Sequence, residues 1–232
     1  MADSNSGSGG GFFAKLTFIL LFVLVCALGV AGYFVMQPQD LTGIGGFAPV
    51  ADAAPPRDLK LVLETAVKRG FPVTLTETEI NHWIAQTLTA NQGGVGAGKV
   101  SLEKVLVCLT DDQVEVVMER KVFGRPFTVS MFLKVAQVQE DGNVRTEVHY
   151  HGGPYHGSTP NILRGGRFGR LVVPQGFLLL VMPAYKKLAE VYQHEMHLAF
   201  AEMVRIRIEP KRLVLESREP EPNDTAGQIQ TF

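Results

Sequence analysis

The sequence has few cysteines, almost no net charge and no familiar catalytic motif, and each shortage excludes a class of protein. Its 232 residues include two cysteines, Cys26 and Cys108, which excludes a small fold held together by disulfides. Its 22 basic and 23 acidic side chains give a net charge of −1, so there is no long-range field to attract nucleic acid. We therefore expect no nucleic acid partner.

Motifs for catalysis and cofactor binding are missing as well. The chain has no G-x-S-x-G sequence, no P-loop and no dinucleotide fingerprint, and the glycines at 93–98 precede a strand-like segment rather than a phosphate-binding helix. Cys108 has apolar neighbours on both sides, which is typical of a buried, unreactive thiol. We predict no cofactor and favour a non-catalytic protein, although the sequence does not exclude an enzyme.

One long apolar run is present, from Leu16 to Met36, with no charge between Lys15 and Asp40. As a helix it is roughly 30 Å long, which matches the hydrocarbon core of a bilayer. Since the apolar core of a cleaved signal peptide is only ~7–15 residues long, the sequence predicts a retained transmembrane helix over 12–36. Lys15 before the run and acidic residues after it favour a cytoplasmic N-terminus and an extracytoplasmic, in bacteria periplasmic, domain at the cell membrane.

Composition divides the rest of the chain. We expect residues 1–11 to be flexible, residues 37–57 to be a flexible linker rich in glycine, proline and alanine, and residues 219–232 to be a disordered tail. Residues 58–218 are enough for one domain with its own core.

Periodicity predicts an α+β domain. Residues 58–68 form an amphipathic helix, and Thr76 and Glu79 stand at the spacing of a capping box that begins a second helix. That helix has Ile80, Trp83, Ile84 and Leu88 on its apolar side, with Asn81, His82 and Gln86 turned away. From Val100 the period changes to two, which predicts an antiparallel meander of four strands.

The meander needs a cover for its apolar face. A long amphipathic helix over 175–203, kinked or restarted at Pro183, supplies it. Residues 204–216 then alternate about the turn at Glu209–Lys211 and are predicted to close the same sheet as a hairpin. The predicted fold is an N-terminal transmembrane helix followed by one antiparallel sheet under one long helix.

Three sets of residues are candidates for a site. Side chains that would line an apolar groove between helix and sheet are Trp83, Phe127, Met131, Phe177, Val181 and Tyr185; the alternative is that all six fill the core. Basic residues placed to meet anionic lipid headgroups are Arg164, Arg167 and Arg170, for which the alternative is a solvated loop. Histidines with metal-ligand spacing are His149, His151 and His156, although strand-end histidines are ordinary and no metal is predicted.

The order of parts resembles that of known envelope proteins. A capped helix reading T-E-x-E-I-N-x-W-I at Thr76 to Ile84, a meander, a long helix and a closing hairpin after an anchor are similar to the YceB-like and LmeA-like families, which are related to the TULIP lipid-binding fold, and to the YpmS-like anchored proteins. The resemblance covers roughly residues 58–216. It implies an extracytoplasmic domain with an apolar groove that can hold a lipid chain, and it supplies no catalytic residue.

Three functional hypotheses follow. The first is a single-pass anchored, non-catalytic domain that binds lipid or another hydrophobic ligand. The second is a structural or assembly role with a solid core, in which the partner is another envelope protein or a second copy paired through the span, where Ala27 and Ala31 are spaced for close helix packing. The third, less favoured, is a metal-dependent enzyme that uses the three histidines.

Overall fold

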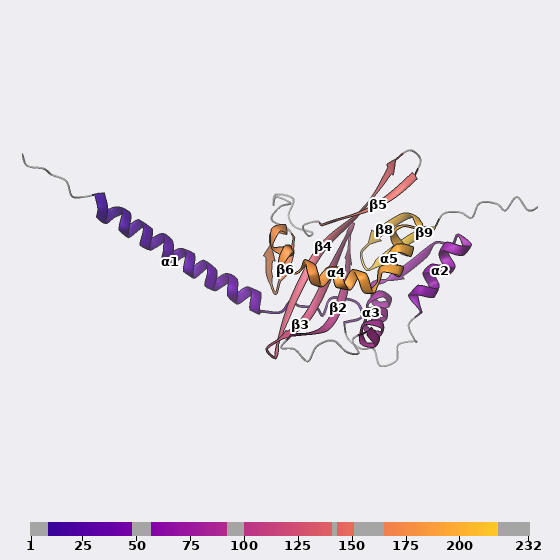
Figure 1. Ribbon diagram of the computed structural model, residues 1–232, viewed down its shortest axis with the longest axis horizontal. Coiled ribbons are helices and arrows are strands. Elements are labelled where there is room, and N and C mark those ends of the chain that lie inside the picture. Colours follow the sequence, from indigo (N-terminus) through magenta and orange to yellow (C-terminus); the bar gives the residue numbers. More distant parts are fainter. Residues whose placement is uncertain (1–8, 48–56, 92–99, 141–142, 151–164, 218–232) are drawn as a thin grey trace, which may run out of the picture.

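The computed structural model describes residues 9–47, 57–91, 100–140, 143–150 and 165–217. An N-terminal helix, α1 (Gly9–Met36), projects from an α+β domain with two antiparallel sheets (Figure 1). Within α1, the 25 residues Phe12–Met36 are long and apolar enough to cross a membrane, and the rest of the protein does not bury them. The predicted fold class and the apolar N-terminal helix are confirmed.

The larger sheet contains the predicted meander. β2 (Val100–Thr110), β3 (Gln113–Val122), β4 (Arg125–Glu140) and β5 (Asn143–Tyr150) follow one another, and each pairs antiparallel with the next. A short hairpin of β6 (Gly166–Phe168) and β7 (Leu171–Val173) joins the same sheet where β6 pairs with β4. Strands of three residues are too short to show a period, so the sequence predicts a loop there.

Helices from two parts of the chain cover one face of this sheet. α3 (Glu77–Asn91) contributes Ile84 and Leu88, while the 3-10 helix η2 (Gln175–Leu180) and α4 (Met182–Val191) contribute Leu178 and Tyr185. These side chains form one buried cluster with apolar residues of β2, β3 and β4. The restart predicted at Pro183 is confirmed, since this proline lies at the beginning of α4.

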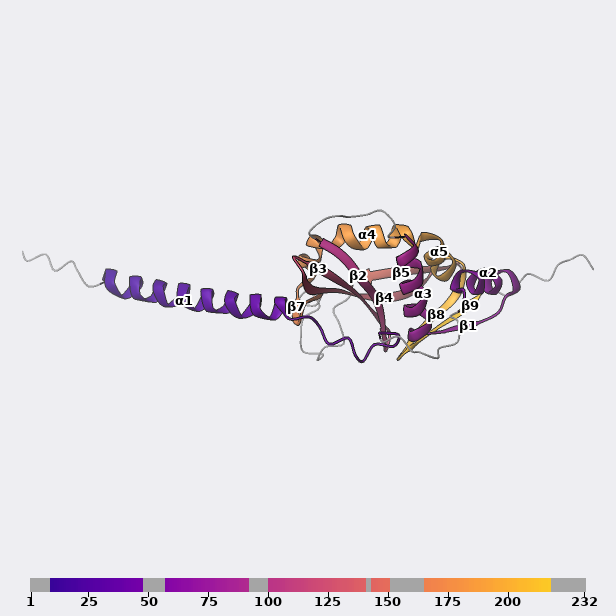
Figure 2. The same ribbon diagram turned by 90° about the horizontal axis from the view of Figure 1, so that it is seen from below.

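The covering helix has a second interruption that the sequence does not predict. Tyr192 ends α4 with φ −107° and ψ 23°, and α5 (Gln193–Phe200) follows it. In α5, Leu198 and Ala199 pack in a cluster with α2 (Leu59–Arg69) and the smaller sheet (Figure 2). The cover thus consists of three segments instead of one helix, because the chain covers both sheets in turn.

The C-terminal hairpin differs from its prediction. β8 (Met203–Glu209) and β9 (Arg212–Ser217) form a separate three-stranded sheet with β1 (Val73–Thr76), in the order β1-β9-β8. The prediction that this hairpin closes the meander is wrong, because β1 takes the place beside β9 and buries Leu75 and Leu215 against α2. The two sheets are joined at the hairpin turns, where Lys211 N donates to Leu109 O (3.1 Å).

The beginning of α3 confirms the capping box. Glu79 N donates to Thr76 Oγ1 (3.2 Å), and Thr76 N donates to Glu79 Oε2 (2.9 Å). Burial by itself raises the pKa of Glu79, but hydrogen bonds from Thr76 and Arg57 outweigh burial, and the net pKa is lowered. The carboxylate is therefore held ionised at the N-terminus of the helix, where the helix dipole favours negative charge.

Candidate functional site

Residues 37–47, here called the strap, lie on the face of the larger sheet that the helices leave open. Figure 2 shows this segment on the side of the sheet away from α4. Leu41 is buried against Leu106 and Val117, whose neighbours Val105 and Met118 point to the helices. Because adjacent residues of a strand face opposite sides of a sheet, the strap and the helices form layers on opposite faces.

The strap is also bonded to the sheet along its course. Gln39 N donates to Thr128 Oγ1 (2.9 Å), and Gln39 Nε2 donates to Ser130 Oγ (3.2 Å). This part of the predicted flexible linker is therefore ordered, and it differs from the expected tether because its polar and apolar side chains find partners on strands distant in sequence. Residues 48–56 of the predicted linker lie outside the described residues.

Two buried side chains of α3 fasten the strap, and we call them the clasp: Glu77 and Asn81. Gly45 N donates to Glu77 Oε1 (2.6 Å), and Asn81 Nδ2 donates to Gly45 O (2.6 Å). Lys211 pairs with the same carboxylate, with Nζ 2.7 Å from Oε1, and also donates to Gly43 O. The i, i+4 spacing of the clasp places both side chains on one side of the helix.

The clasp also caps the free edge of β2. Asn81 accepts from Val107 N (2.6 Å) and donates to Val107 O (2.8 Å), and Glu77 Oε2 accepts from Leu109 N (2.7 Å). Unpaired edge groups would otherwise offer a template for a further strand. Asn81 lies off the apolar side of α3, as the sequence predicts, but it is buried there because it bonds to backbone groups of β2 and of the strap.

The end of α1 is bonded to the turn between β6 and β7. Arg170 N donates to Phe34 O (3.0 Å), and its Nε donates to Pro38 O (3.4 Å). Gly169 has φ 56°, and a Cβ atom there would collide with carbonyl oxygens at the end of α1 and the start of the strap. Only glycine meets both demands, so the end of α1 has a defined position on the domain.

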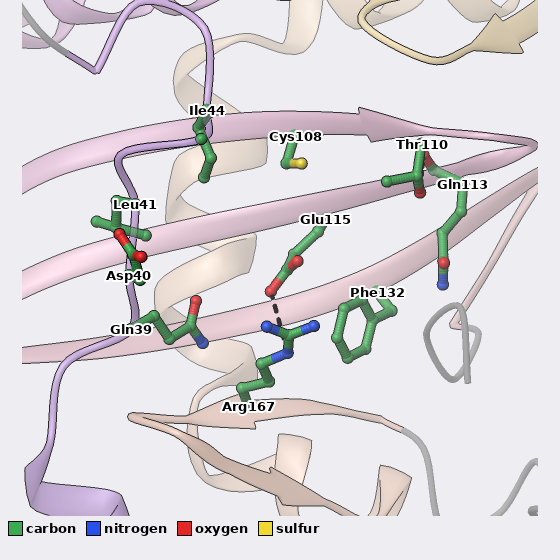
Figure 3. A pocket seen from close by; sticks show the side chains of 11 residues that line it. Gln39, Asp40, Leu41, Ile44, Cys108, Thr110, Gln113, Glu115, Phe132 and Arg167 are labelled. Atoms are coloured by element: carbon green, nitrogen blue, oxygen red, sulfur yellow. Dashed lines mark hydrogen bonds and ion pairs between the residues drawn. The ribbon is translucent and has the colours of Figure 1, made fainter. Parts of the chain in front are cut away.

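A cavity of about 290 Å³ lies between the strap and the sheet (Figure 3). Gln39 and Asp40 line it from the strap, and Gln113 and Glu115 line it from β3. Arg167 reaches in from β6, with Nε 3.7 Å from Glu115 Oε1 and its guanidinium 5.4 Å from the ring centre of Phe132. The cavity therefore combines a cation, two carboxylates and amide groups.

Two buried polar atoms of this cavity have no hydrogen-bond partner among the described residues: Gln113 Nε2 and Glu115 Oε1. Buried polar groups are normally paired, and Glu115 Oε1 has its ion pair with Arg167 at 3.7 Å, so the Gln113 Nε2 donor is the group left for water or a small polar ligand. Hydrogen bonds from the hydroxyl and the backbone N–H of Thr42 lower the pKa of Asp40. The arrangement suits binding of a polar group more than proton transfer.

Cys108 lines the cavity but is unsuited to nucleophilic chemistry. Burial, and then the negative charges of Glu77 and Glu115, raise the pKa of Cys108 to about 11. In a Cys26→Ala background at pH 8, we expect iodoacetamide to modify Cys108 about 100-fold more slowly in the folded protein than in urea, because the thiolate reacts. Peptide mass spectrometry measures both rates, and equal rates would contradict the raised pKa.

The six predicted groove residues mostly contribute to packing. Met131 and Tyr185 are buried in the cluster between helices and sheet, and Trp83, Phe127 and Val181 pack against it. The Tyr185 hydroxyl donates to Val116 O (2.9 Å) and Val129 O (3.1 Å), and burial raises its pKa. Phe177 is the exception, with 52 % of its surface exposed. These contacts favour the alternative in which the residues fill the core.

The arginines predicted to contact headgroups lie in different surroundings, and most of the histidines predicted to bind metal lie outside the described residues. Arg170 is exposed beside the end of α1, as a headgroup contact requires, whereas Arg167 points into the cavity and Arg164 lies outside the described residues. Arg167 contacts Glu115 and Phe132 on the larger sheet, which differs from the exposed position that a headgroup contact requires. His151 and His156 also lie outside the described residues, and His149 is placed by the pairing of its backbone with Lys134.

Sequence reasoning missed the strap and the clasp. The available signals were the glycines at 43, 45 and 46, which permit a close approach of backbone, and the i, i+4 pair of Glu77 and Asn81 within the motif that carries the family resemblance. Neither signal shows which groups the glycines and the two side chains contact, because the partners are backbone groups of β2 and of the strap.

Comparison of the chain with protein-family models, with curated proteins and with solved structures gives no match. The resemblance to envelope lipid-binding families thus stays a prediction. What the fold and the site define is a class: an α+β domain docked onto the end of one N-terminal helix that is long and apolar enough to span a membrane. In the described part of the chain, no group of three or more potential ligands could hold a metal ion.

Proposed function

We propose that this protein is a single-pass membrane protein that holds a non-catalytic, lipid-contacting domain in one fixed orientation on the extracytoplasmic surface. The observation that carries the proposal is the docking of the domain onto the end of α1 through Arg170, Gly169, the strap and the clasp. A flexible tether would let the domain rotate freely. A docked one presents the same face to the membrane at all times.

The orientation across the membrane is proposed from charge. Lys15 precedes the apolar segment, whereas Asp40 is the first charged residue after it. Basic residues favour the cytoplasmic side. Lipid is proposed as the partner because α1, when inserted, places the docked end of the domain at the bilayer surface.

Two spin labels test the fixed orientation. Full-length protein lacking Cys26 and Cys108 is labelled at Met36→Cys, at the end of α1, and at Leu61→Cys, an exposed position on α2. In proteoliposomes we expect one narrow distance distribution by pulsed electron paramagnetic resonance, because the docked end of α1 moves with the domain. A broad distribution would refute the fixed orientation.

Protease added outside spheroplasts or inside-out vesicles tests the sidedness in the same protein. We expect digestion of the domain only where the extracytoplasmic side is accessible. Digestion from the cytoplasmic side alone would refute the proposed topology without affecting the distance measurement.

A further inference from the structure

The end of the domain next to α1 exposes large apolar side chains. Figures 1 and 2 both show the β3–β4 turn, the β6–β7 hairpin and the beginning of the α4 cover at this end. We call the exposed apolar residues of these elements the proximal face: Phe123 (75 % exposed), Val172 (37 %), Phe177 (52 %), Leu179 (73 %) and Leu180 (73 %). Apolar residues gathered at one end of a domain mark a contact surface.

Aromatic pairs indicate the depth of this surface relative to a bilayer. Phe12 and Phe13 pack edge to face near one end of α1, and Tyr33 and Phe34 do so near the other. About 20 helical residues separate the pairs, or roughly 30 Å, which equals the thickness of the hydrocarbon core. Because tyrosine favours the membrane interface, Tyr33 marks the outer interface, one residue before Phe34.

The proximal face is bonded to α1 at the outer membrane interface. Arg170 N bonds to Phe34 O, so the turn between β6 and β7 lies at the depth of the headgroups when α1 spans the bilayer. α1 also contacts both β6 and β7. The exposed apolar side chains at this end of the domain therefore lie next to the boundary between the headgroups and the acyl chains.

The charge of this end fits an anionic lipid surface. Lys121 and Arg125 are exposed on either side of the β3–β4 turn, where Val122 pairs with Arg125 in the last rung of the sheet. Arg170 supplies a third exposed cation in the adjacent hairpin. Basic residues around an apolar tip are typical of segments that lie in the interface of anionic membranes.

We infer that the proximal face inserts into the headgroup and upper acyl region of the membrane that α1 spans, with Phe123, Phe177, Leu179 and Leu180 in apolar contact and the three cations at anionic headgroups. The inference rests on the proposed function, since it requires the docked orientation. It adds the surface, its residues and the lipid class.

An environment-sensitive fluorophore tests the insertion. Full-length protein without Cys26 and Cys108 is labelled with NBD at Leu180→Cys and placed in vesicles of phosphatidylcholine and phosphatidylglycerol, at no more than one copy per vesicle. We expect blue-shifted emission and at least about twofold quenching by lipids with nitroxide near the headgroup, since interfacial side chains lie ~5–10 Å deep.

Leu61→Cys is the matched control, because Leu61 is also an exposed leucine (60 %) but lies on α2, at the end of the domain opposite α1 in both views. Its label should emit as in water and resist lipid quenching. Water-like emission at both positions would overturn the inference, while a narrow spin-label distance in the same protein would leave the proposed orientation standing.

Two further outcomes are decisive. Quenching at position 180 that is equal in pure phosphatidylcholine would overturn the assignment of the cations to anionic headgroups. A blue shift at position 180 that appears only when many copies share a vesicle, without lipid quenching, would overturn the lipid contact in favour of self-association.

Discussion

Replacement of Asn81 by leucine is expected to lower the free energy of unfolding by about 4 kcal/mol. Asn81 is fully buried and bonds to Val107 N, Val107 O and Gly45 O. Leucine has a similar size but leaves all three backbone groups without partners, and each buried unpaired group costs about 1–3 kcal/mol. Urea unfolding of the full-length protein in detergent, followed by circular dichroism, measures the change.

The control for Asn81→Leu lies on the same helix. Gln86 is exposed, so Gln86→Leu should change stability by no more than about 0.5 kcal/mol. If both leucine variants had the same stability, the hydrogen bonds of Asn81 would contribute nothing to the stability of the fold. The proximity of Asn81 to the strap also predicts faster proteolysis of residues 37–47 in the leucine variant.

The second large effect is expected for Gly169→Ala, which should release the end of α1 from the domain. Alanine at position 169 is strained at φ 56° and collides with backbone oxygens of Val35 and Gln37. Backbone atoms cannot yield as a flexible side chain does, so we expect separation of the hairpin from α1. A local loss of about 1.4 kcal/mol raises the open population tenfold, which limited proteolysis of the strap detects.

Gly124→Ala provides a matched control for the effect of left-handed backbone. Gly124 has φ 80° in the neighbouring β3–β4 turn, but a Cβ atom there meets no atom within 4 Å. The Gly124→Ala variant has a strained backbone at position 124 but no collision. Protease should therefore cleave the strap of this variant at the wild-type rate. If the strap were cleaved faster than in the wild type and at the same rate in Gly169→Ala and Gly124→Ala, backbone strain, and not contact with α1, would explain the result at position 169.

Both predictions concern the same mechanical feature. The strap is short, and it is bonded at Gln39 and Gly45 and buried at Leu41. Loss of either the clasp or the Gly169 contact should broaden the spin-label distances and reduce lipid quenching at position 180. The proposed membrane contact therefore depends on residues that lie away from the contact surface itself.

Local patterns in the sequence predicted much of the fold. The Thr76 and Glu79 pair places the beginning of α3 correctly, and the alternation after Val100 predicts four paired strands. Pro183 predicts the restart of the covering helix. These features depend on residues within a few positions of one another, so periodicity and capping chemistry are sufficient to identify them.

Long-range pairing accounts for the errors. The β8–β9 hairpin is predicted correctly as a hairpin but joins β1, more than a hundred residues away in sequence, instead of the meander. Asn81 lies off the apolar side of α3, and no local pattern shows that it is buried there together with Glu77. Its burial depends on the free edge of β2, and no local pattern shows which strand edge remains unpaired.

By itself the sequence determined that one apolar helix precedes an α+β domain with a meander, because hydrophobicity and period are properties of single segments. Only the tertiary structure decided that residues 37–47 are a clasped strap, that Arg167 faces a cavity while Arg170 bonds to α1, and that the exposed apolar residues of η2 lie at the same end of the domain as α1. These outcomes depend on which distant groups meet, and that is settled by packing of the whole chain.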